Sequence, residues 1–200
     1  MTLANNDALR EAIKFAQHGF PVFPGTPGHG LAGPTADFAS ILDFAVKEPD
    51  APWAVRGRVE HGLIIVKFGR ERCRLHLERD WNESFPATLT IERGNQGTEY
   101  RVYLATFATG ELSNRHISAT RAFVSACAPL PGSVEPKSGE LWTYREGDGP
   151  GDIVPLPRNL VDRLPLFVAF DPRGITRNVV ERAEWTPGPY RSEWNDDRDW

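Results

Sequence analysis

Residues 63–66, Leu-Ile-Ile-Val, constrain the fold of this chain more than any other segment. No polar residue interrupts this run, but it is far too short for a membrane-spanning helix, which needs about 20 residues. A strand that is apolar at consecutive positions is typically buried on both of its faces. We therefore expect residues 63–68 to form a central strand in a sheet. The 200 residues suffice for one sizeable core.

Helical periodicity precedes this strand, and alternating patterns follow it. A first helix is expected to start at Asn6 and Asp7 and to end at Gly19, and a second, capped by Thr35 or Asp37, to stop before Pro49. The remaining patterns predict strands over 20–23, 53–55, 88–93, 99–104, 122–127, 141–145 and 166–170, and helices over 70–80 and 159–164. Residues 94–97, Gly-Asn-Gln-Gly, indicate a hairpin turn. Helices followed by a strand-rich centre predict an α+β domain.

The last thirty residues differ from the rest of the chain. Residues 171–200 combine proline, glycine, tryptophan and mixed charge without any period. Such a segment cannot bury enough apolar surface to fold by itself. We therefore expect one domain over 1–170 and an extended acidic and aromatic arm, in part disordered, over 171–200.

Charge and cysteine content exclude several classes of protein. The formal charge of −4 and the pI near 5.8 exclude a surface that attracts nucleic acid everywhere, so any such contact must come from a local patch. The two cysteines, Cys73 and Cys127, form no CxxC pair and indicate neither a metal site nor a disulfide framework. Residues 1–10 have no basic run followed by an apolar core, so we do not expect a secretion signal there. The sequence predicts a soluble, cytoplasmic protein without a membrane partner.

Five short motifs, in order, suggest a family. The first is a helix of the form Ala-Leu-x-x-Ala followed by the strand Phe20-Pro21-Val22-Phe23-Pro24. The others are Thr35-Ala36-Asp37, Gly62-Leu63-Ile64-Ile65-Val66, Pro86-Ala87-Thr88-Leu89-Thr90, and the loop 128–133 followed by Ser138-Gly139 and an aromatic strand. In this order the motifs resemble the N-terminal domain of bifunctional DNA primase–polymerases, in the archaeo-eukaryotic primase superfamily. The resemblance covers about residues 8–165.

The resemblance implies a fold and a chemistry. The fold would be a mixed or antiparallel sheet with an RRM-like core, an N-terminal αβ unit and flanking helices. The chemistry would be nucleotidyl transfer, in which two divalent metal ions activate the attacking oxygen and stabilise the leaving phosphate. In the family, Mg²⁺ or Mn²⁺ is held by an Asp-x-Asp or Asp-x-Glu pair at the end of the Gly-Leu-Val-Val strand.

This sequence departs from the family at its catalytic positions. Lys67 and Gly69 stand where the metal-binding carboxylates are expected, and no aspartate occurs between Asp80 and Asp148 for the third ligand. No histidine lies within residues 97–104, where the family has one that contacts the nucleotide, and Glu135 stands near the place of a later family histidine. We therefore predict a catalytically inactive member with no catalytic residues, no bound metal and no cofactor.

Six residues are candidates for binding nucleotide or nucleic acid, and each has a structural alternative. They are Lys67, Arg70, Arg101, Tyr103, Ser133 and Lys137. Lys67 could replace the charge of the metal, or lie at a strand end and reach solvent. Arg101 and Tyr103 could bind and stack a nucleotide, or reflect the alternation of a half-buried strand. Ser133 and Lys137 could hold a phosphate, or belong to a polar loop.

The arginines of the segment 70–80 have two interpretations as well. With Arg56 and Arg58 they could form a basic face for a nucleic-acid backbone. However, a spacing of two places Arg70, Arg72 and Arg74 around a helix rather than on one stripe, so a solvated helix is favoured.

Three functional hypotheses remain open. The first is a primase–polymerase-like domain that binds single-stranded nucleic acid or a nucleoside triphosphate, or is accessory to replication of a chromosome or mobile element. The second is an active nucleotidyltransferase with displaced carboxylates, such as Glu71, Glu99 or Glu135. The third is a protein-interaction module on an inactive primase fold, with a replication protein bound through the C-terminal arm.

Overall fold

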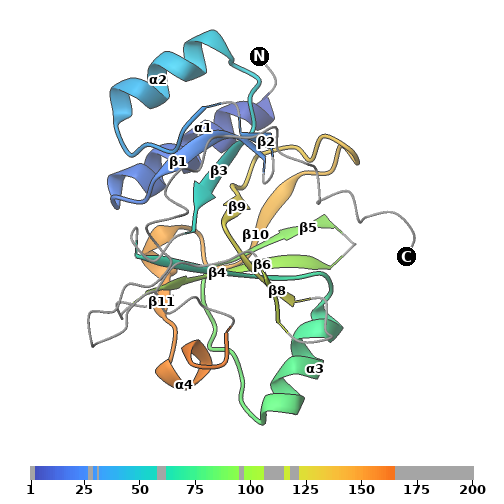
Figure 1. The fold of residues 1–200 in the computed structure, drawn as a ribbon. Helices are drawn as coiled ribbons and strands as arrows, with labels where there is room; N and C mark the ends of the chain where they lie inside the picture. Colours follow the sequence, from blue (N-terminus) through green and yellow to red (C-terminus); the bar gives the residue numbers. More distant parts are fainter. Residues whose placement is uncertain are drawn as a thin grey trace, which may run out of the picture.

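The computed structural model describes residues 3–26, 29–30, 32–57, 62–94, 97–105, 115–117 and 122–164. Within these residues the chain is α+β, with largely antiparallel sheets and a few helices (Figure 1). The expected strand over 166–170 and the expected arm over 171–200 lie outside the described residues. Arg58 and the expected boundary between the domain and the arm, at 170/171, lie outside them as well.

The first half of the chain carries three helices among short strands. In order these are α1 (Leu3–Gln17), β1 (Val22–Thr26), β2 (His29–Gly30), α2 (Phe38–Lys47), β3 (Trp53–Arg56), β4 (Leu63–Phe68) and α3 (Glu71–Trp81). The second half is mostly strand: β5 (Thr90–Arg93), β6 (Thr98–Leu104), β7 (Arg115–His116), β8 (Ala122–Ser125), β9 (Cys127–Pro129), β10 (Trp142–Glu146), the 3₁₀ helix η3 (Pro150–Asp152), β11 (Val154–Pro155) and α4 (Arg158–Val161).

The strands form two sheets. The smaller has the order β2-β1-β3-β9, and the larger has the order β10-β5-β6-β4-β8-β7, with β11 pairing in parallel with β6. β4 lies between β6 and β8 and is antiparallel to both, which confirms it as a central strand. The antiparallel pairing of β5 with β6 confirms the expected hairpin.

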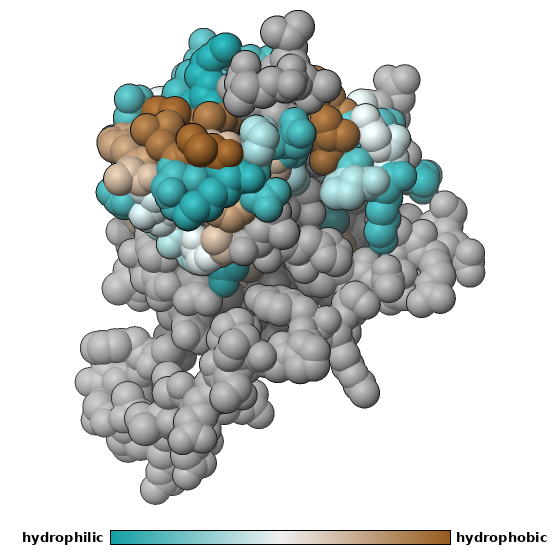
Figure 2. Space-filling view, turned by 90° about the horizontal axis from the view of Figure 1, so that it is seen from above, coloured by the Kyte–Doolittle hydropathy of each residue, from teal (hydrophilic) through white to brown (hydrophobic). Residues whose placement is uncertain are grey.

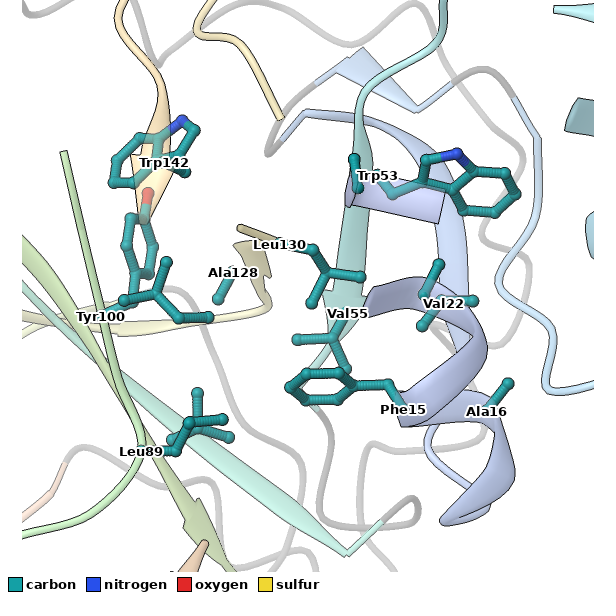
Figure 3. Close-up of a cluster of buried hydrophobic side chains, with 14 of the residues drawn as sticks. Phe15, Ala16, Val22, Trp53, Val55, Leu89, Tyr100, Ala128, Leu130 and Trp142 are labelled. Carbon is teal, nitrogen blue, oxygen red and sulfur yellow. The ribbon is translucent and has the colours of Figure 1, made fainter. Parts of the chain in front are cut away.

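One face of the larger sheet packs against α1, α2 and the smaller sheet, which together we call the N-terminal unit. The buried cluster on this face includes Phe15 of α1, Trp53 and Val55 of β3, Ile65 of β4 and Trp142 of β10. Figure 3 shows Phe15, Val55 and Trp53 at one end of this cluster, Tyr100 and Trp142 at the other, and Leu130 between them. The N-terminal unit therefore shares a single core with the larger sheet, and we call this side the N-terminal face.

The opposite face of the larger sheet packs against α3 and α4, which lie below it in Figure 1. Its buried cluster alternates with the first along β4, because Ile64, Val66 and Phe68 belong to it. Leu77 of α3 and Leu160 of α4 complete this cluster. Burial on both faces explains why residues 63–66 are apolar at consecutive positions.

A single stretch of chain joins the two sheets. β8 pairs with β4 in the larger sheet, the chain bends at Ala126, and β9 then pairs with β3 in the smaller sheet. The sequence predicted one strand over 122–127. That prediction was wrong, because the bend gives the two parts different partners.

Several element boundaries also differ from the sequence prediction. α1 begins at Leu3 rather than at Asn6 and Asp7, and β1 covers Val22–Thr26 rather than 20–23. α4 ends at Val161, where the chain continues in turns. α2 begins as expected, because the Asp37 carboxylate accepts a hydrogen bond from the backbone N–H of Ser40 at 2.9 Å.

One glycine sets how closely the loop after β9 approaches α1. Gly132 has φ +85, and a Cβ there would lie 2.5 Å from the backbone nitrogen of Ala8. A side chain at Gly132 would therefore collide with the helix backbone. None of the described helices has the length and the apolar character that crossing a membrane requires.

Candidate functional site

Lys67 lies at the end of the central strand, on the N-terminal face of the larger sheet. Its register partners are Tyr100 on β6 and Phe123 on β8. The Nζ atom is 5.6 Å from the centroid of the Tyr100 ring, a distance at which an ammonium interacts with an aromatic face. Lys67 is half-buried, so its charge lies at the rim of the core rather than in open solvent.

Two aromatic rings and then a second cation follow Lys67 along this end of the sheet. The rings of Tyr100 and Trp142 meet edge to face, with centroids 5.4 Å apart, and the Arg93 guanidinium lies 5.4 Å from the Trp142 ring centroid. Lys67, Tyr100, Trp142 and Arg93 thus form one row, which we call the cation–aromatic row. The Nε1 atom of Trp142 is buried and has no hydrogen-bond partner among the described residues.

Two carboxylates lie at the Arg93 end of this row. Arg93 is 3.4 Å from an oxygen of Glu135 and 3.4 Å from an oxygen of Glu140. These contacts neutralise Arg93 at one end of the row, and Lys67 lies at the other end.

Gly69 and Arg70 connect the row to helix α3. The Gly69 carbonyl accepts a hydrogen bond from Thr98 Oγ1 at 3.3 Å, which holds the end of β4 against the start of β6. A Cβ at Gly97 would lie 3.9 Å from Arg70 Cα, so the hairpin end of β6 lies beside the first residue before α3. The Arg70 side chain is exposed.

Arg101 and Tyr103 do not join Lys67, because they lie on the opposite face of β6. Tyr103 is fully buried, donates its hydroxyl proton to the Pro86 carbonyl at 3.1 Å and packs against Phe85. Burial raises the pKa of Tyr103 above its ordinary value. No face of this ring is left open on which a base could stack.

Arg101 belongs to a buried ion network between α3 and the sheet. Glu99, fully buried, accepts hydrogen bonds from Arg101 at 3.2 Å and from Arg74 at 3.0 Å on one oxygen, and from Arg145 at 3.1 Å on the other. Arg74 is also bound by Glu78, and Arg145 by Glu71. These contacts satisfy the buried charges mutually, which is what makes their burial tolerable.

The ion network corrects one expectation about α3. The sequence favoured a solvated helix, yet Arg74 points inward and its side chain is only 13% exposed. Arg145 holds the pKa of Glu71 below its usual value by hydrogen bonding and by charge. Arg74 therefore lies in a buried environment, unlike the exposed arginines of α3.

Ser133 precedes the turn that leads into β10, and Lys137 lies within that turn. Ser133 is fully buried, and its hydroxyl is 2.9 Å from both the backbone nitrogen and the carbonyl oxygen of Trp53. It accepts from the first and donates to the second, so it joins the loop to β3. Lys137 is exposed in the turn that the Val134–Leu141 bridge closes.

The three carboxylates considered as displaced metal ligands do not form one group. Glu71 and Glu99 approach each other because Arg145 binds both, whereas Glu135 contacts Arg93 on the N-terminal face. Within the part of the chain that the structure describes, no cluster of three or more His, Cys, Asp or Glu side chains could hold a metal ion.

Sequence reasoning missed three members of the row, Tyr100, Arg93 and Trp142. Nothing local marks them, since Tyr100 meets Lys67 only when β6 pairs with β4, and Trp142 meets Arg93 only when β10 pairs with β5. The ion network had a local signal. Glu99 and Arg101 are opposite charges two residues apart on a strand, and such residues share one face.

The chain matches no protein-family model and no curated protein. The primase–polymerase resemblance therefore stays a prediction.

Proposed function

We propose that this chain is a catalytically inactive primase–polymerase-like domain that binds nucleotide or nucleic acid in the replication of a chromosome or mobile element. The proposal rests on the motif order in the sequence and on one feature of the site. A cation, Lys67, occupies the strand end where the family holds its metal ions, and it lies at the rim of the N-terminal face.

The chemistry of Lys67 supports binding rather than transfer. The family's metal ions neutralise a triphosphate and activate the attacking oxygen. An ammonium group can do the first, because it attracts phosphate, but it cannot polarise an attacking oxygen as a divalent cation does. With lysine at position 67 and glycine at position 69, neither position of the family's carboxylate pair supplies an oxygen ligand for a metal.

The surroundings of Lys67 favour contact with a phosphate rather than stacking of a base. The Tyr100 ring lies beside the ammonium and the Trp142 ring follows it in the cation–aromatic row, but both side chains are only 3% exposed. Neither ring therefore offers an open face to a base. The part of a nucleotide or nucleic acid that Lys67 can attract is its phosphate.

The test is a titration of the full-length chain with labelled single-stranded DNA and, separately, with a nucleoside triphosphate, each with and without Mn²⁺. We expect binding that does not require metal and that weakens as salt rises. Lys67→Gln should weaken both ligands, whereas Lys47→Gln, which changes an exposed lysine of α2 bound to Asp43, should weaken neither. Binding that demands Mn²⁺, or no binding of either ligand, would contradict the proposal.

A second candidate function, a protein-interaction module, is favoured by the outer side of α2. Phe38, Leu42 and Val46 follow one another at a spacing of four and are exposed, Val46 to 82%. Figure 2, which views the molecule from the α2 end, shows hydrophobic atoms gathered on the surface beside hydrophilic ones. Exposed apolar stripes of this kind mark surfaces that partners cover.

A hollow on the other side of α2 adds to this candidate. It has a volume of about 270 Å³, with Phe44 and Trp53 in its lining and the Asp43–Lys47 ion pair at its edge. Recovery of a stable protein partner with the wild-type chain, and its loss with Leu42→Glu, would favour this function over the first. The absence of a partner for either variant would remove it.

A further inference from the structure

The charged side chains of helix α3 have different contacts on its inner and outer sides. The helix carries three acidic residues, Glu71, Glu78 and Asp80, and three arginines, Arg72, Arg74 and Arg79, so its formal charges cancel. Neutral composition does not mean a neutral surface, however, because the contacts differ from residue to residue.

Two of the acidic residues are engaged with inward-pointing arginines. Glu78 contacts Arg74 at 3.0 Å and accepts a hydrogen bond from the backbone N–H of Phe85. Glu71 contacts Arg74 at 3.3 Å and Arg145 at 2.9 Å. The negative charges of these carboxylates are therefore balanced by arginines of the ion network, Glu78 in the interior and Glu71 at its exposed edge.

The outer side of α3 keeps its arginines. Arg72, Leu75, His76 and Arg79 are exposed, and their spacing of three, four and seven places them on one face of a helix. Arg79 contacts His76 Nδ1 at 2.7 Å, and Asp80 contacts His76 Nε2 at 3.3 Å. Within the described residues, neither Arg72 nor Arg70 has an acidic partner.

Counting Arg70 with this face, three arginines stand against the single carboxylate of Asp80. The basic patch arises in a protein whose formal charge is −4, so it is local rather than general. Arg72 and Arg79 are separated by about 10.5 Å along the helix axis, at 1.5 Å per residue. That separation is too long for two contacts with one phosphate group, and it fits two positions on a polymer.

We propose that the outer face of α3, through Arg70, Arg72 and Arg79, binds the phosphodiester backbone of a nucleic acid. This inference rests on the proposed function, and it adds a second surface to it. Arg70 lies between Lys67 and α3 along the chain, because it follows Lys67 by three residues and immediately precedes the first residue of α3. Because Lys67 lies on the N-terminal face of the sheet and α3 covers the opposite face, only an extended polymer that passes the end of β4 at Arg70 could contact both.

The experiment compares two double variants with the full-length wild type. One is Arg72→Gln with Arg79→Gln. The control is Arg10→Gln with Arg158→Gln, which changes net charge equally at helix arginines whose side chains are 66% and 73% exposed and lie away from α3. Each is titrated by fluorescence anisotropy with single-stranded and duplex DNA and with a nucleoside triphosphate, between about 50 and 200 mM salt.

We expect the α3 variant to bind DNA more weakly and to lose part of its salt dependence, while nucleoside triphosphate binding stays at the wild-type level. Each lost single-strand contact lowers the slope of log affinity against log salt by about 0.7, so two contacts lower it by about 1.4. That change corresponds to about a sevenfold smaller loss of affinity across the salt range. The control variant should keep the wild-type slope.

An α3 variant with the wild-type slope for both DNA forms would overturn the inference, as would a control that loses as much. A failure of the proposed function looks different, because the wild type would then bind no nucleoside triphosphate and Lys67→Gln would change nothing. An effect on duplex DNA alone would assign the face to duplex rather than to single strands, with the backbone contact unchanged.

Discussion

The two faces of the larger sheet are both buried, yet they achieve this by different means. The N-terminal face is covered by α1 and the smaller sheet through apolar side chains such as Phe15, Val55 and Ile65. The α3 face is apolar around Leu77 but carries Glu99 and Arg101 at the end of the sheet beneath α3. Adjacent residues of the same strand, Tyr100 and Arg101, thus enter different environments.

The two faces therefore differ in how much stability a substitution costs. An apolar face loses contacts in proportion to the atoms removed, so small changes have small costs. A buried ion network fails abruptly, because deletion of one partner leaves others charged and unpaired in a low-dielectric interior. The cation–aromatic row lies on the tolerant face and the ion network on the sensitive one, so changes to the two can be told apart.

The largest effect is expected from Glu99→Ala. The variant removes the carboxylate that three arginines share and leaves Arg101 buried, so the free energy of unfolding should fall by about 3–5 kcal/mol. Urea denaturation measures this loss. Glu99→Gln, which keeps an acceptor oxygen but no charge, should lose less. A loss below about 1 kcal/mol for Glu99→Ala would mean that the two faces do not differ as described.

Ile65→Val tests the apolar face on the neighbouring strand. Removing one methylene from this fully buried side chain should cost about 0.5–1.5 kcal/mol, since only a small void remains. The same urea experiment applies. Ile64→Val, which lies on the α3 face of β4 but within its apolar part, is the matched control and should cost a similar amount. A much larger loss for either variant would show strain that the packing does not reveal.

Glu71→Gln tests the exposed edge of the ion network through its effect on how the free energy of unfolding depends on pH. Arg145 lowers the pKa of Glu71 in the folded chain from the ordinary 4.5, so the ionised carboxylate stabilises the fold above that pH, and this contribution disappears as pH falls through the lower folded value. Because the side chain is 49% exposed, the contribution should stay below about 1 kcal/mol.

The measurement is the unfolding free energy between pH 7 and acid. The wild type should lose stability below about pH 4.5, and Glu71→Gln should show a shallower loss over that window. Glu48→Gln, a change at an exposed residue just after α2, is the control and should retain the wild-type profile. Equal acid profiles for wild type and Glu71→Gln would argue against the Arg145 contact.

Leu75→Ala should have the smallest effect. Leu75 points outward from α3 and is half exposed, so the free energy of unfolding should change by no more than about 0.5 kcal/mol. Leu77→Ala, two residues on and fully buried, should cost about 2–5 kcal/mol. Thermal or urea unfolding of the pair checks whether α3 is oriented as described, since a reversed ranking would require the helix to be rotated.

Local patterns predicted the parts of the fold that depend on local physics. The consecutive apolar residues of β4 and the glycine-bounded turn between β5 and β6 led to the correct central strand and hairpin. The Asp37 cap set the start of α2. The bend at Ala126 was missed because a change of strand partner leaves no trace in an otherwise continuous β pattern.

The candidate site was less predictable for the same reason. Lys67 was singled out through the family resemblance, because it stands at the end of an apolar strand where the first metal-binding carboxylate is expected. Its row with Tyr100, Trp142 and Arg93 depends on the registers of two strand pairs, and these are set by the whole sheet. Ser133 looked like a loop residue, and only the fold shows that its hydroxyl bonds the backbone of Trp53.

The division of one stretch of chain between β8 and β9 also has a consequence for how the protein is made. β3 emerges from the ribosome early, but its partner on one side is β9, with Ala54 paired to Pro129. At 5–20 residues per second, translation supplies that partner only after a delay of about 4 to 15 s. Throughout that interval the nascent N-terminal unit has an open sheet edge, so this is the period in which a chaperone would be expected to bind it.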